Sequence, residues 1–222
     1  MIIMKVLWLG HSAFIYKFSD ATVLIDPFIS GNPTAPLKVD ELPKVDVVLV
    51  THSHMDHFGD APDVVRKSGA YFVSSFEVAQ KIPGEKSMGI NIGGTVNIGN
   101  LRITQVQAVH SHEEGPATGF VIRHPEGILY HAGDTGIMTD MSLIGKLYRP
   151  RIAFLPIGGY FTMGIEEAVE AVGLVQSKIV VPMHYNTFDV IKADPYEFKR
   201  KVEERYHGVT VEVFEPGEEK EL

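Results

Sequence analysis

The chain has 222 residues, of which 45% are hydrophobic and 22% charged, with no cysteine and a formal net charge of −8. The lack of cysteine excludes disulfides and thiolate metal ligands, and the acidic balance argues against sequence-independent binding of nucleic acid, which depends on Lys and Arg. The apolar opening MIIMKVLWLG is too short for a membrane span and lacks a signal-peptide cleavage pattern. We therefore expect a cytoplasmic protein with no membrane or nucleic-acid partner, forming one domain over residues 1–222.

The N-terminal third is predicted to contain short strands joined by tight turns. β-rich segments bounded by Gly, Ser-Asp or Pro lie at residues 4–10, 12–18 and 22–27. The continuous apolar run at 45–51 is typical of a strand covered on both faces. A short helix is expected at 60–69, with Asp60 as its N-cap and Gly69 as its end. A strand at 70–74 and a helix at 74–82 follow.

The rest of the chain begins with two predicted hairpins, at 95–110 and 117–135. Helices are then expected at 139–147, 165–177 and 194–206, alternating with strands at 151–157, 178–183 and 209–214. In the second of these helices Ala168, Val169 and Val172 fall on one face, so it should lie against a sheet. A meander followed by helix–strand alternation occurs twice, which predicts two sheets stacked face to face with helices outside.

Three histidines and an aspartate follow the apolar run at 45–51, in the motif H-x-H-x-D-H at residues 52–57. In an extended chain alternate residues point the same way, so His52, His54 and Asp56 can converge. His57 points elsewhere unless the chain turns, and Gly59 makes such a turn inexpensive. The spacing therefore favours ligands divided between two neighbouring metal ions over four ligands on one ion.

Further metal-type ligands end other predicted strands. His110, Asp134 and His184 each follow a hydrophobic run and precede small or turn-favouring residues. A catalytic zinc-type centre takes ligands from several parts of the chain. We therefore expect these three side chains to join the His52 cluster.

The motifs GHSAF, LIDP, THSHMDH, VHS, HAGDT and VPMHY span nearly the whole chain and resemble those of the metallo-β-lactamase superfamily. The chain is most similar to a branch of small, uncharacterised metal-dependent hydrolases related to ascorbate-6-phosphate lactonase. The resemblance implies an α/β fold, the four-layer αββα sandwich, with a metal centre at one edge of the two sheets. It also implies two sets of ligands and one bridging carboxylate: His52, His54 and His110 at the first metal, Asp56, His57 and His184 at the second, and Asp134 between them.

Seven nitrogen and oxygen ligands without sulfur suit two divalent ions, zinc first, with Mn, Fe or Ni as alternatives. Two ions sharing one solvent molecule would make hydroxide available near neutral pH, because coordination lowers the pKa of water from about 15.7 to about 7. Asp56 is expected to orient that hydroxide as a catalytic residue. The prediction is a metal-dependent hydrolase acting on a small-molecule ester, lactone or phosphoester.

Differences from other branches of the family favour hydrolysis. Redox diiron members carry Glu where His54 stands, and the main zinc β-lactamases carry Cys where Asp134 stands. Two alternatives stay open: a mononuclear iron oxidoreductase of the persulfide-dioxygenase type, and a non-catalytic metal-binding protein. Because homo-oligomers are common among related proteins, a monomer should not be assumed.

Several other residues have two interpretations. Asp26 could hydrogen-bond the distal nitrogen of a ligand histidine, or form an ordinary Asp-Pro turn. His11 could contact substrate or give a proton to the leaving group, or be a buried loop histidine. The segment 158–164 could line the site or cap the next helix. His112 is expected not to be a ligand, His131 to face the core or support a ligand, and His124 and His207 to lie on the surface.

Overall fold

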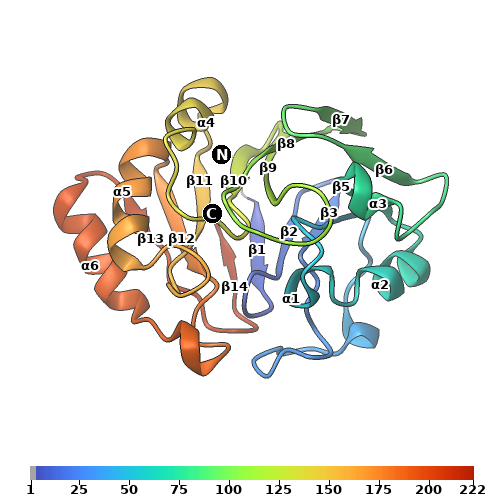
Figure 1. Ribbon diagram of the computed structural model, residues 1–222, viewed down its shortest axis with the longest axis horizontal. Helices are drawn as coiled ribbons and strands as arrows, with labels where there is room; N and C mark the ends of the chain where they lie inside the picture. Colours follow the sequence, from blue (N-terminus) through green and yellow to red (C-terminus); the bar gives the residue numbers. More distant parts are fainter. Residues whose placement is uncertain (1–3) are drawn as a thin grey trace.

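The computed structural model describes residues 4–222, and residues 1–3 of the apolar opening lie outside the described residues. The chain forms two seven-stranded sheets (Figure 1). The first sheet has the order β14-β1-β2-β3-β4-β5-β6 and the second β13-β12-β11-β10-β9-β8-β7. The strands of the first sheet are β1 (Lys5–Trp8), β2 (Phe14–Lys17), β3 (Thr22–Ile25), β4 (Val47–Leu49), β5 (Tyr71–Ser75), β6 (Ser87–Ile90) and β14 (Glu219–Glu221). Those of the second are β7 (Thr95–Ile98), β8 (Leu101–Gln107), β9 (Thr118–His124), β10 (Gly127–His131), β11 (Ile152–Pro156), β12 (Ile179–Met183) and β13 (Thr210–Val211).

Each sheet begins as an antiparallel meander and continues with parallel strands, as the sequence predicts. Strands β1, β2 and β3 pair antiparallel, whereas β3, β4, β5 and β6 pair parallel. In the second sheet β7 to β10 pair antiparallel and β10 to β13 parallel. Because parallel neighbours end at the same edge of a sheet, the segments that follow them meet there.

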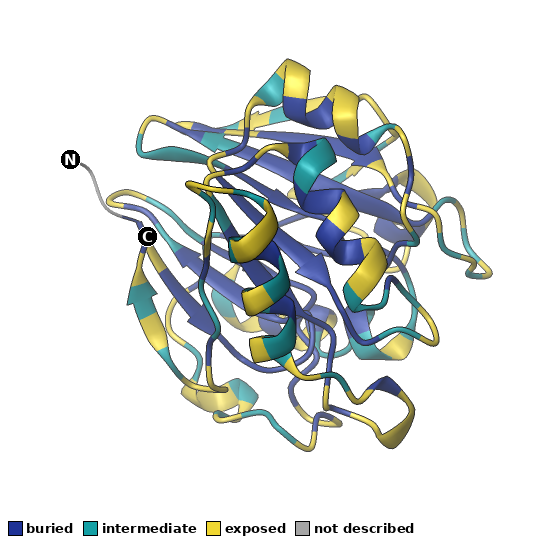
Figure 2. Cartoon of the chain, turned by 90° about the vertical axis from the view of Figure 1, so that its left-hand side faces the viewer, coloured by how far each residue is buried: buried dark blue, intermediate teal, exposed yellow. Residues whose placement is uncertain are grey.

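Helices cover the outer face of each sheet, which confirms the expected αββα sandwich (Figure 1). On the first sheet these are α1 (Met55–Phe58), α2 (Ala61–Ser68) and α3 (Phe76–Ala79), and on the second α4 (Met141–Tyr148), α5 (Ile165–Val175) and α6 (Pro195–Arg205). The helices over the second sheet turn exposed residues outward and buried residues toward the strands (Figure 2). None of the helices among residues 4–222 is long and apolar enough to cross a membrane.

The side chains of the first sheet alternate between two apolar layers. Phe14 and Tyr16 of β2 join the core between the sheets, whereas Ile15 faces the other way, into the layer that also holds Val64 of α2. This is the period of two expected for a strand. Both faces are covered by apolar groups, so the apolar runs in the sequence are continuous.

Two strands and one cap differ from the sequence-based expectations. Strand β14 pairs with β1, but its Glu-Lys-Glu sequence carries no apolar pattern because it is a charged edge strand. Strand β6 is short and contains Gly89, which lies against α3 with no room for a side chain. Asp60 stands at the N-cap position of α2, but its carboxylate accepts hydrogen bonds from the backbone N–H groups of Ile29 and Ser30 instead.

Candidate metal centre

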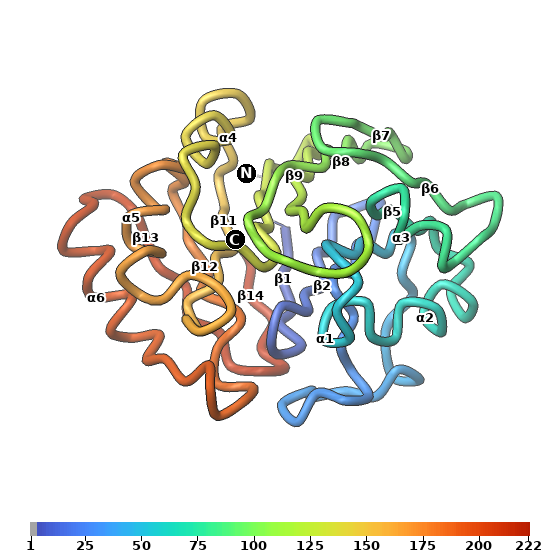
Figure 3. The backbone as a smooth tube through the Cα atoms, viewed as in Figure 1, coloured from blue at the N-terminus to red at the C-terminus, as the bar shows by residue number. Residues whose placement is uncertain are grey.

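The expected ligands come together at one edge of the sandwich, where strands of both sheets end. The segments that follow β4, β8, β10 and β12 supply them, and Figure 3 traces the course of the backbone through these segments. Between β4 and α1 the chain bends at Thr51, Ser53 and His54, and the helix begins at Met55. Gly59 ends this helix with a φ of 35°, and a side chain there would meet the backbone of Pro27 and Phe28.

Three imidazoles form a first group at this edge: His52, His54 and His110. The Nε2 atom of His52 lies 3.0 Å from Nδ1 of His54, and Nε2 of His110 lies 3.2 Å from the same atom. His52 is fully buried, and burial holds its pKa well below the usual range. The imidazole is therefore neutral, the form that can bind a metal ion.

A second group lies beside the first and contains His11, Asp56, His57 and His184. His11 was not among the ligands expected from the sequence. In the structure its Nε2 atom lies 3.1 Å from Oδ2 of Asp56. The rings of His11 and His184 are 4.1 Å apart between centroids. Burial, reinforced by His184, lowers the pKa of His11 to about 4.

Asp134 lies between the two groups. Its Oδ1 atom is 3.2 Å from Nε2 of His57, and its Oδ2 atom is 3.0 Å from Nε2 of His184 and 3.7 Å from Nε2 of His110. Its side chain is only 3% exposed. Although burial opposes ionisation, His184 and His57 hold the pKa of Asp134 well below its usual range. A buried carboxylate that faces both groups is placed to neutralise cations in each.

Asp26 orients two of the histidines. Its Oδ2 atom lies 2.8 Å from Nδ1 of His57 and also accepts a hydrogen bond from the Thr51 hydroxyl. Since that hydroxyl donates to Asp26, it accepts from Nδ1 of His52 at 3.0 Å. Both rings then carry their proton on Nδ1 and turn the Nε2 lone pair toward the site, the arrangement that outer partners impose on metal-binding histidines.

The unpaired buried atoms of the cluster suit coordination to metal. Nε2 of His57, Oδ1 of Asp134 and Nε2 of His184 are buried and have no hydrogen-bond partner. Unpaired buried polar atoms are costly in an apolar interior, so native proteins pair them with a donor, water or an ion. Zinc binds imidazole nitrogen and carboxylate oxygen at about 2.0–2.2 Å. Tetrahedral ligands at this bond length lie a little over ~3 Å apart, and Nε2 of His57 lies 3.2 Å from Oδ1 of Asp134.

The remaining histidines lie outside the metal-capable groups of the described residues. His112 has its Nδ1 atom 3.0 Å from the Ser53 hydroxyl. His131 is buried in the core, with Nε2 on the Ser12 carbonyl and Nδ1 accepting from Gly133 N–H. His124 is buried rather than at the surface as expected, because it stacks on Phe18 and pairs with Asp20. His207 is exposed as expected.

Sequence reasoning missed two hydroxyl residues that serve the site, Thr51 and Thr187. Thr187 Oγ1 lies 2.9 Å from Nδ1 of His11, and both residues are buried. Thr51 could have been noticed as a hydroxyl residue at the end of an apolar strand, directly before His52. Thr187 carries no comparable signal, because its partner is 176 residues away in the chain.

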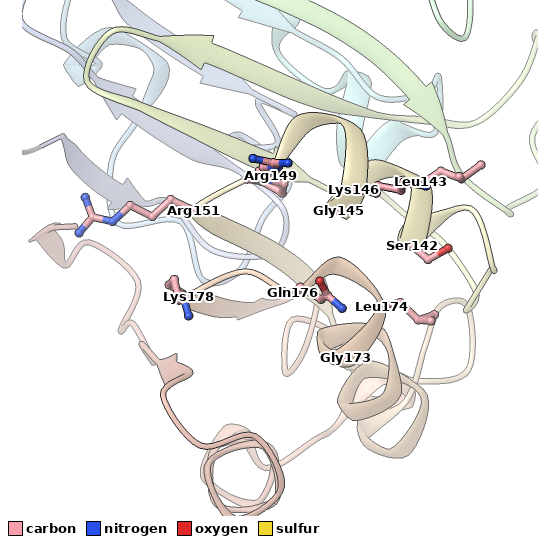
Figure 4. Close-up of a pocket in the computed structure, with 11 residues that line it drawn as sticks. Ser142, Leu143, Gly145, Lys146, Arg149, Arg151, Gly173, Leu174, Gln176 and Lys178 are labelled. Atoms are coloured by element: carbon pink, nitrogen blue, oxygen red, sulfur yellow. The ribbon is translucent and has the colours of Figure 1, made fainter.

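A cavity of about 870 Å³ lies away from this cluster, between α4 and α5 (Figure 4). Its lining includes Lys146, Arg149, Arg151 and Lys178 and contains no His, Asp or Glu. Arg151 and Lys178 directly precede β11 and β12, so they stand at the opposite ends of these strands from the ligands. The cavity offers no group that commonly binds a divalent metal ion.

Comparison with known families gives one match over most of the chain. The family model described as "Beta-lactamase superfamily domain" matches residues 5–184. The chain is 48% identical over 227 residues to a UPF0173 metal-dependent hydrolase of Methanopyrus kandleri, covering 97% of this chain and 98% of that protein. It is also 48% identical over 216 residues to one of Caldivirga maquilingensis, covering 95% of each.

Solved structures agree with this match. Igni18, described as a novel metallo hydrolase from the hyperthermophilic archaeon Ignicoccus hospitalis, superposes with a TM-score of 0.92 at 41% identity, covering 99% of this chain and 98% of that one. An isothiocyanate hydrolase from Delia radicum gut bacteria superposes with a TM-score of 0.78 at 21% identity, covering 98% of each chain. At that identity the second likeness concerns the fold alone.

Proposed function

Because this chain belongs to the β-lactamase superfamily and is a metal-dependent hydrolase, we propose that it cleaves a small ester, lactone or phosphoester with two divalent metal ions. The observation that carries this proposal is the position of Asp134, whose Oδ2 atom lies 3.0 Å from Nε2 of His184 in the second group and 3.7 Å from Nε2 of His110 in the first. His52, His54 and His110 would hold the first ion, and Asp56, His57 and His184 the second. Zinc fits these ligands best, with Mn, Fe or Ni as alternatives.

When bound, such ions lower the pKa of water and polarise the group under attack. The chain itself contributes orientation and charge. Asp26 and Thr51 hold the protons of His57 and His52 on Nδ1, so that both Nε2 atoms stay free for coordination. Asp56 keeps a side chain that is 26% exposed at the outer side of the cluster. As a carboxylate it is an acceptor for the proton of an attacking water molecule.

Elemental analysis combined with a substrate panel tests the proposal. The purified protein should contain about two equivalents of metal per chain and hydrolyse at least one activated ester or phosphodiester. A chelator should abolish this activity, and added zinc or manganese should restore it. One tightly held iron per chain would favour the mononuclear oxidoreductase instead, and two retained ions without turnover on any ester, lactone or phosphoester would favour a metal-binding protein.

We propose a different role for His11 from the proton donor that the sequence suggests. Thr187 directs its hydroxyl toward the Tyr185 carbonyl, 3.4 Å away, and therefore accepts from Nδ1 of His11. Nε2 of His11 then presents a lone pair to Oδ2 of Asp56 at 3.1 Å. Two acceptors at this distance repel each other unless a cation lies between them. His11 would accordingly be a further ligand of the second ion.

Replacement of His11 should lower metal content as well as rate. We expect His11→Ala to retain the first ion and lose the second, because the three ligands of the first group are untouched. Thr187→Val keeps the shape of the side chain but removes the hydroxyl that holds the His11 ring. It should lower the affinity for the second ion about 10- to 100-fold, as the loss of a residue that hydrogen-bonds a metal ligand does. Metal titration followed by elemental analysis measures both. Two full equivalents in His11→Ala would rule out the ligand role.

A further inference from the structure

Large apolar side chains gather around the candidate metal centre although they are exposed. Twelve such side chains are exposed among residues 4–222. Five of them lie in the segments that carry the ligands, and two more, Tyr160 and Phe161, lie in the neighbouring segment after β11. Isolated exposed apolar residues are ordinary, whereas a concentration of them marks a binding surface. We call these seven the apolar rim: Met55, Val109, Ile137, Tyr160, Phe161, Phe188 and Val190.

One part of the rim is fastened to the first group of ligands. The backbone of Phe161 lies close enough to the His110 ring to favour its protonated form. The same segment is joined to the one after Asp134 by a hydrogen bond of 3.0 Å from Met163 N–H to the Thr135 carbonyl. The Tyr160 and Phe161 rings pack edge to face, 4.7 Å apart between centroids. This part of the rim is therefore held beside the ligands and not at a distance from them.

Another part of the rim lies beside the second group. The Phe188 ring is 5.6 Å from the His11 ring and 6.3 Å from the Phe28 ring, measured between centroids. Met55 stands between the ligands His54 and Asp56 in the chain, and it is 76% exposed. Apolar groups thus flank both groups of ligands, where the part of a substrate next to the reacting bond would lie.

Positive charge is missing from the same segments. Residues 9–13, 50–60, 108–117, 132–140, 157–164 and 184–191 contain no Lys or Arg. The adjoining Lys192 pairs with Asp189 at 2.7 Å, and Lys81 pairs with Glu114 at 2.7 Å. Recognition of a phosphate or carboxylate group on a substrate normally uses Arg or Lys. Away from the ions, the site therefore offers apolar contact and no partner for a second anion.

We propose that the substrate is a neutral ester or lactone whose apolar acyl or aryl group packs on the apolar rim. The proposal rests on the proposed hydrolytic function and narrows it, because it disfavours phosphomonoesters and substrates with an additional carboxylate. Tyr160 and Phe161 are assigned the largest contact, since they are exposed to 78% and 52% and stand beside the first group of ligands.

A matched series of esters tests the assignment with the metal-loaded protein. The value of kcat/KM should rise at least about tenfold from 4-nitrophenyl acetate to 4-nitrophenyl hexanoate, since each buried methylene favours binding. It should be lower for the 4-nitrophenyl monoester of succinic acid than for the butyrate, which has the same chain length without the carboxylate. A flat dependence on chain length, or a preference for the charged ester, would overturn the rim assignment while leaving hydrolysis itself intact.

If no ester of the series is cleaved, that result counts against the proposed hydrolytic function and not against the rim. A measurement of ligand affinity then tests the rim by itself. Hydroxamates bind metal centres, so calorimetry with acetohydroxamate and hexanohydroxamate reports the rim separately from turnover. The longer compound should bind at least about tenfold more tightly. Equal affinity for the two, or no binding by either, would overturn the proposal.

Substitution locates the contact. In the double variant Tyr160→Ser/Phe161→Ser the ratio of hexanoate to acetate should fall to within about threefold of unity. Leu143→Ser is the matched control, since Leu143 is also 52% exposed but lies on α4, and it should keep the wild-type ratio. If light scattering instead shows that the double variant dissociates an oligomer without changing the ratio, the rim is an interface between copies and not a substrate surface.

Discussion

Asp134→Ala and His54→Ala should each abolish hydrolysis, with a loss on the order of 10³-fold or more, and should lower bound metal. Asp134 is the carboxylate that faces both groups of ligands, and its removal would leave His57 and His184 without their shared anion. His54 supplies the Nδ1 atom that approaches both His52 and His110. Elemental analysis and ester hydrolysis on the same preparations measure the two effects.

The fold should survive His54→Ala, because His54 is only partly buried and makes no contact on which the core depends. Bound metal stabilises the folded state by itself. The melting temperatures should therefore be compared in chelator, where we expect a difference of no more than about 3 °C. Normal metal content and normal rates in both His54→Ala and Asp134→Ala would remove the basis for the assignment.

His112 and Asp140 provide matched controls for the substitutions of His54 and Asp134. The His112 ring lies 5.9 Å from the His54 ring between centroids, but its Nδ1 atom faces Ser53. Asp140 belongs to the same connecting segment as Asp134 and stands at the start of α4. His112→Ala and Asp140→Ala should keep both equivalents of metal. Loss of metal in His112→Ala would mean that this ring, and not the one at His54, is a ligand.

The sheets could be predicted because their apolar segments are unambiguous, whereas the edges could not. Strands such as β4 and β12 are apolar on both faces and are bounded by turn residues, so pattern alone identifies them. Strand β14 consists of Glu219, Lys220 and Glu221 and pairs with β1 at the edge of the sheet. Nothing local distinguishes such a segment from a charged loop.

The alternation of side chains in an extended chain predicts only part of the arrangement of the ligands. His52 and His54 lie in one group, as alternation predicts, although the chain bends at Ser53 between them. Helix α1 begins at the next residue, so Asp56 and His57 turn together toward the other group. The division into two groups follows from this change of conformation, which the motif indicates only through its spacing.

Asp26 was offered by the sequence as a partner of a ligand histidine, but the partner of His11 lay beyond prediction for a different reason. The pair His11–Thr187 depends on the approach of the β1–β2 turn to the segment after β12, and the hydrogen bond from His184 N–H to the His11 carbonyl fixes that approach. Such contacts arise from the packing of two sheets against each other. Sequence spacing contains no information on them, and they determine which nitrogen of each ring is free.

Gly158→Ala should lower the affinity for the second ion by displacing the backbone of His184, without replacing any ligand side chain. A Cβ atom at this position would lie 2.2 Å from the His184 carbonyl oxygen and 2.9 Å from Cβ of Ile191. His184 already has a φ of 55°, so its backbone has little freedom to move aside. A displacement of the ligand by about 1 Å should cost on the order of 10²-fold in rate. Metal titration should show weaker binding at one of two sites.

Gly145→Ala separates this effect from a general loss of stability. A Cβ atom there would lie 2.4 Å from the Val175 carbonyl oxygen, in the contact between α4 and α5. Overpacking of this kind costs about 1–3 kcal/mol in the free energy of unfolding, offset in part by the better helix propensity of alanine. Both variants should therefore unfold at lower denaturant concentration, while only Gly158→Ala loses affinity for the second ion. If Gly145→Ala loses metal to the same extent, metal content follows overall stability, and the close approach of Gly158 to His184 has no specific role in holding the ligand.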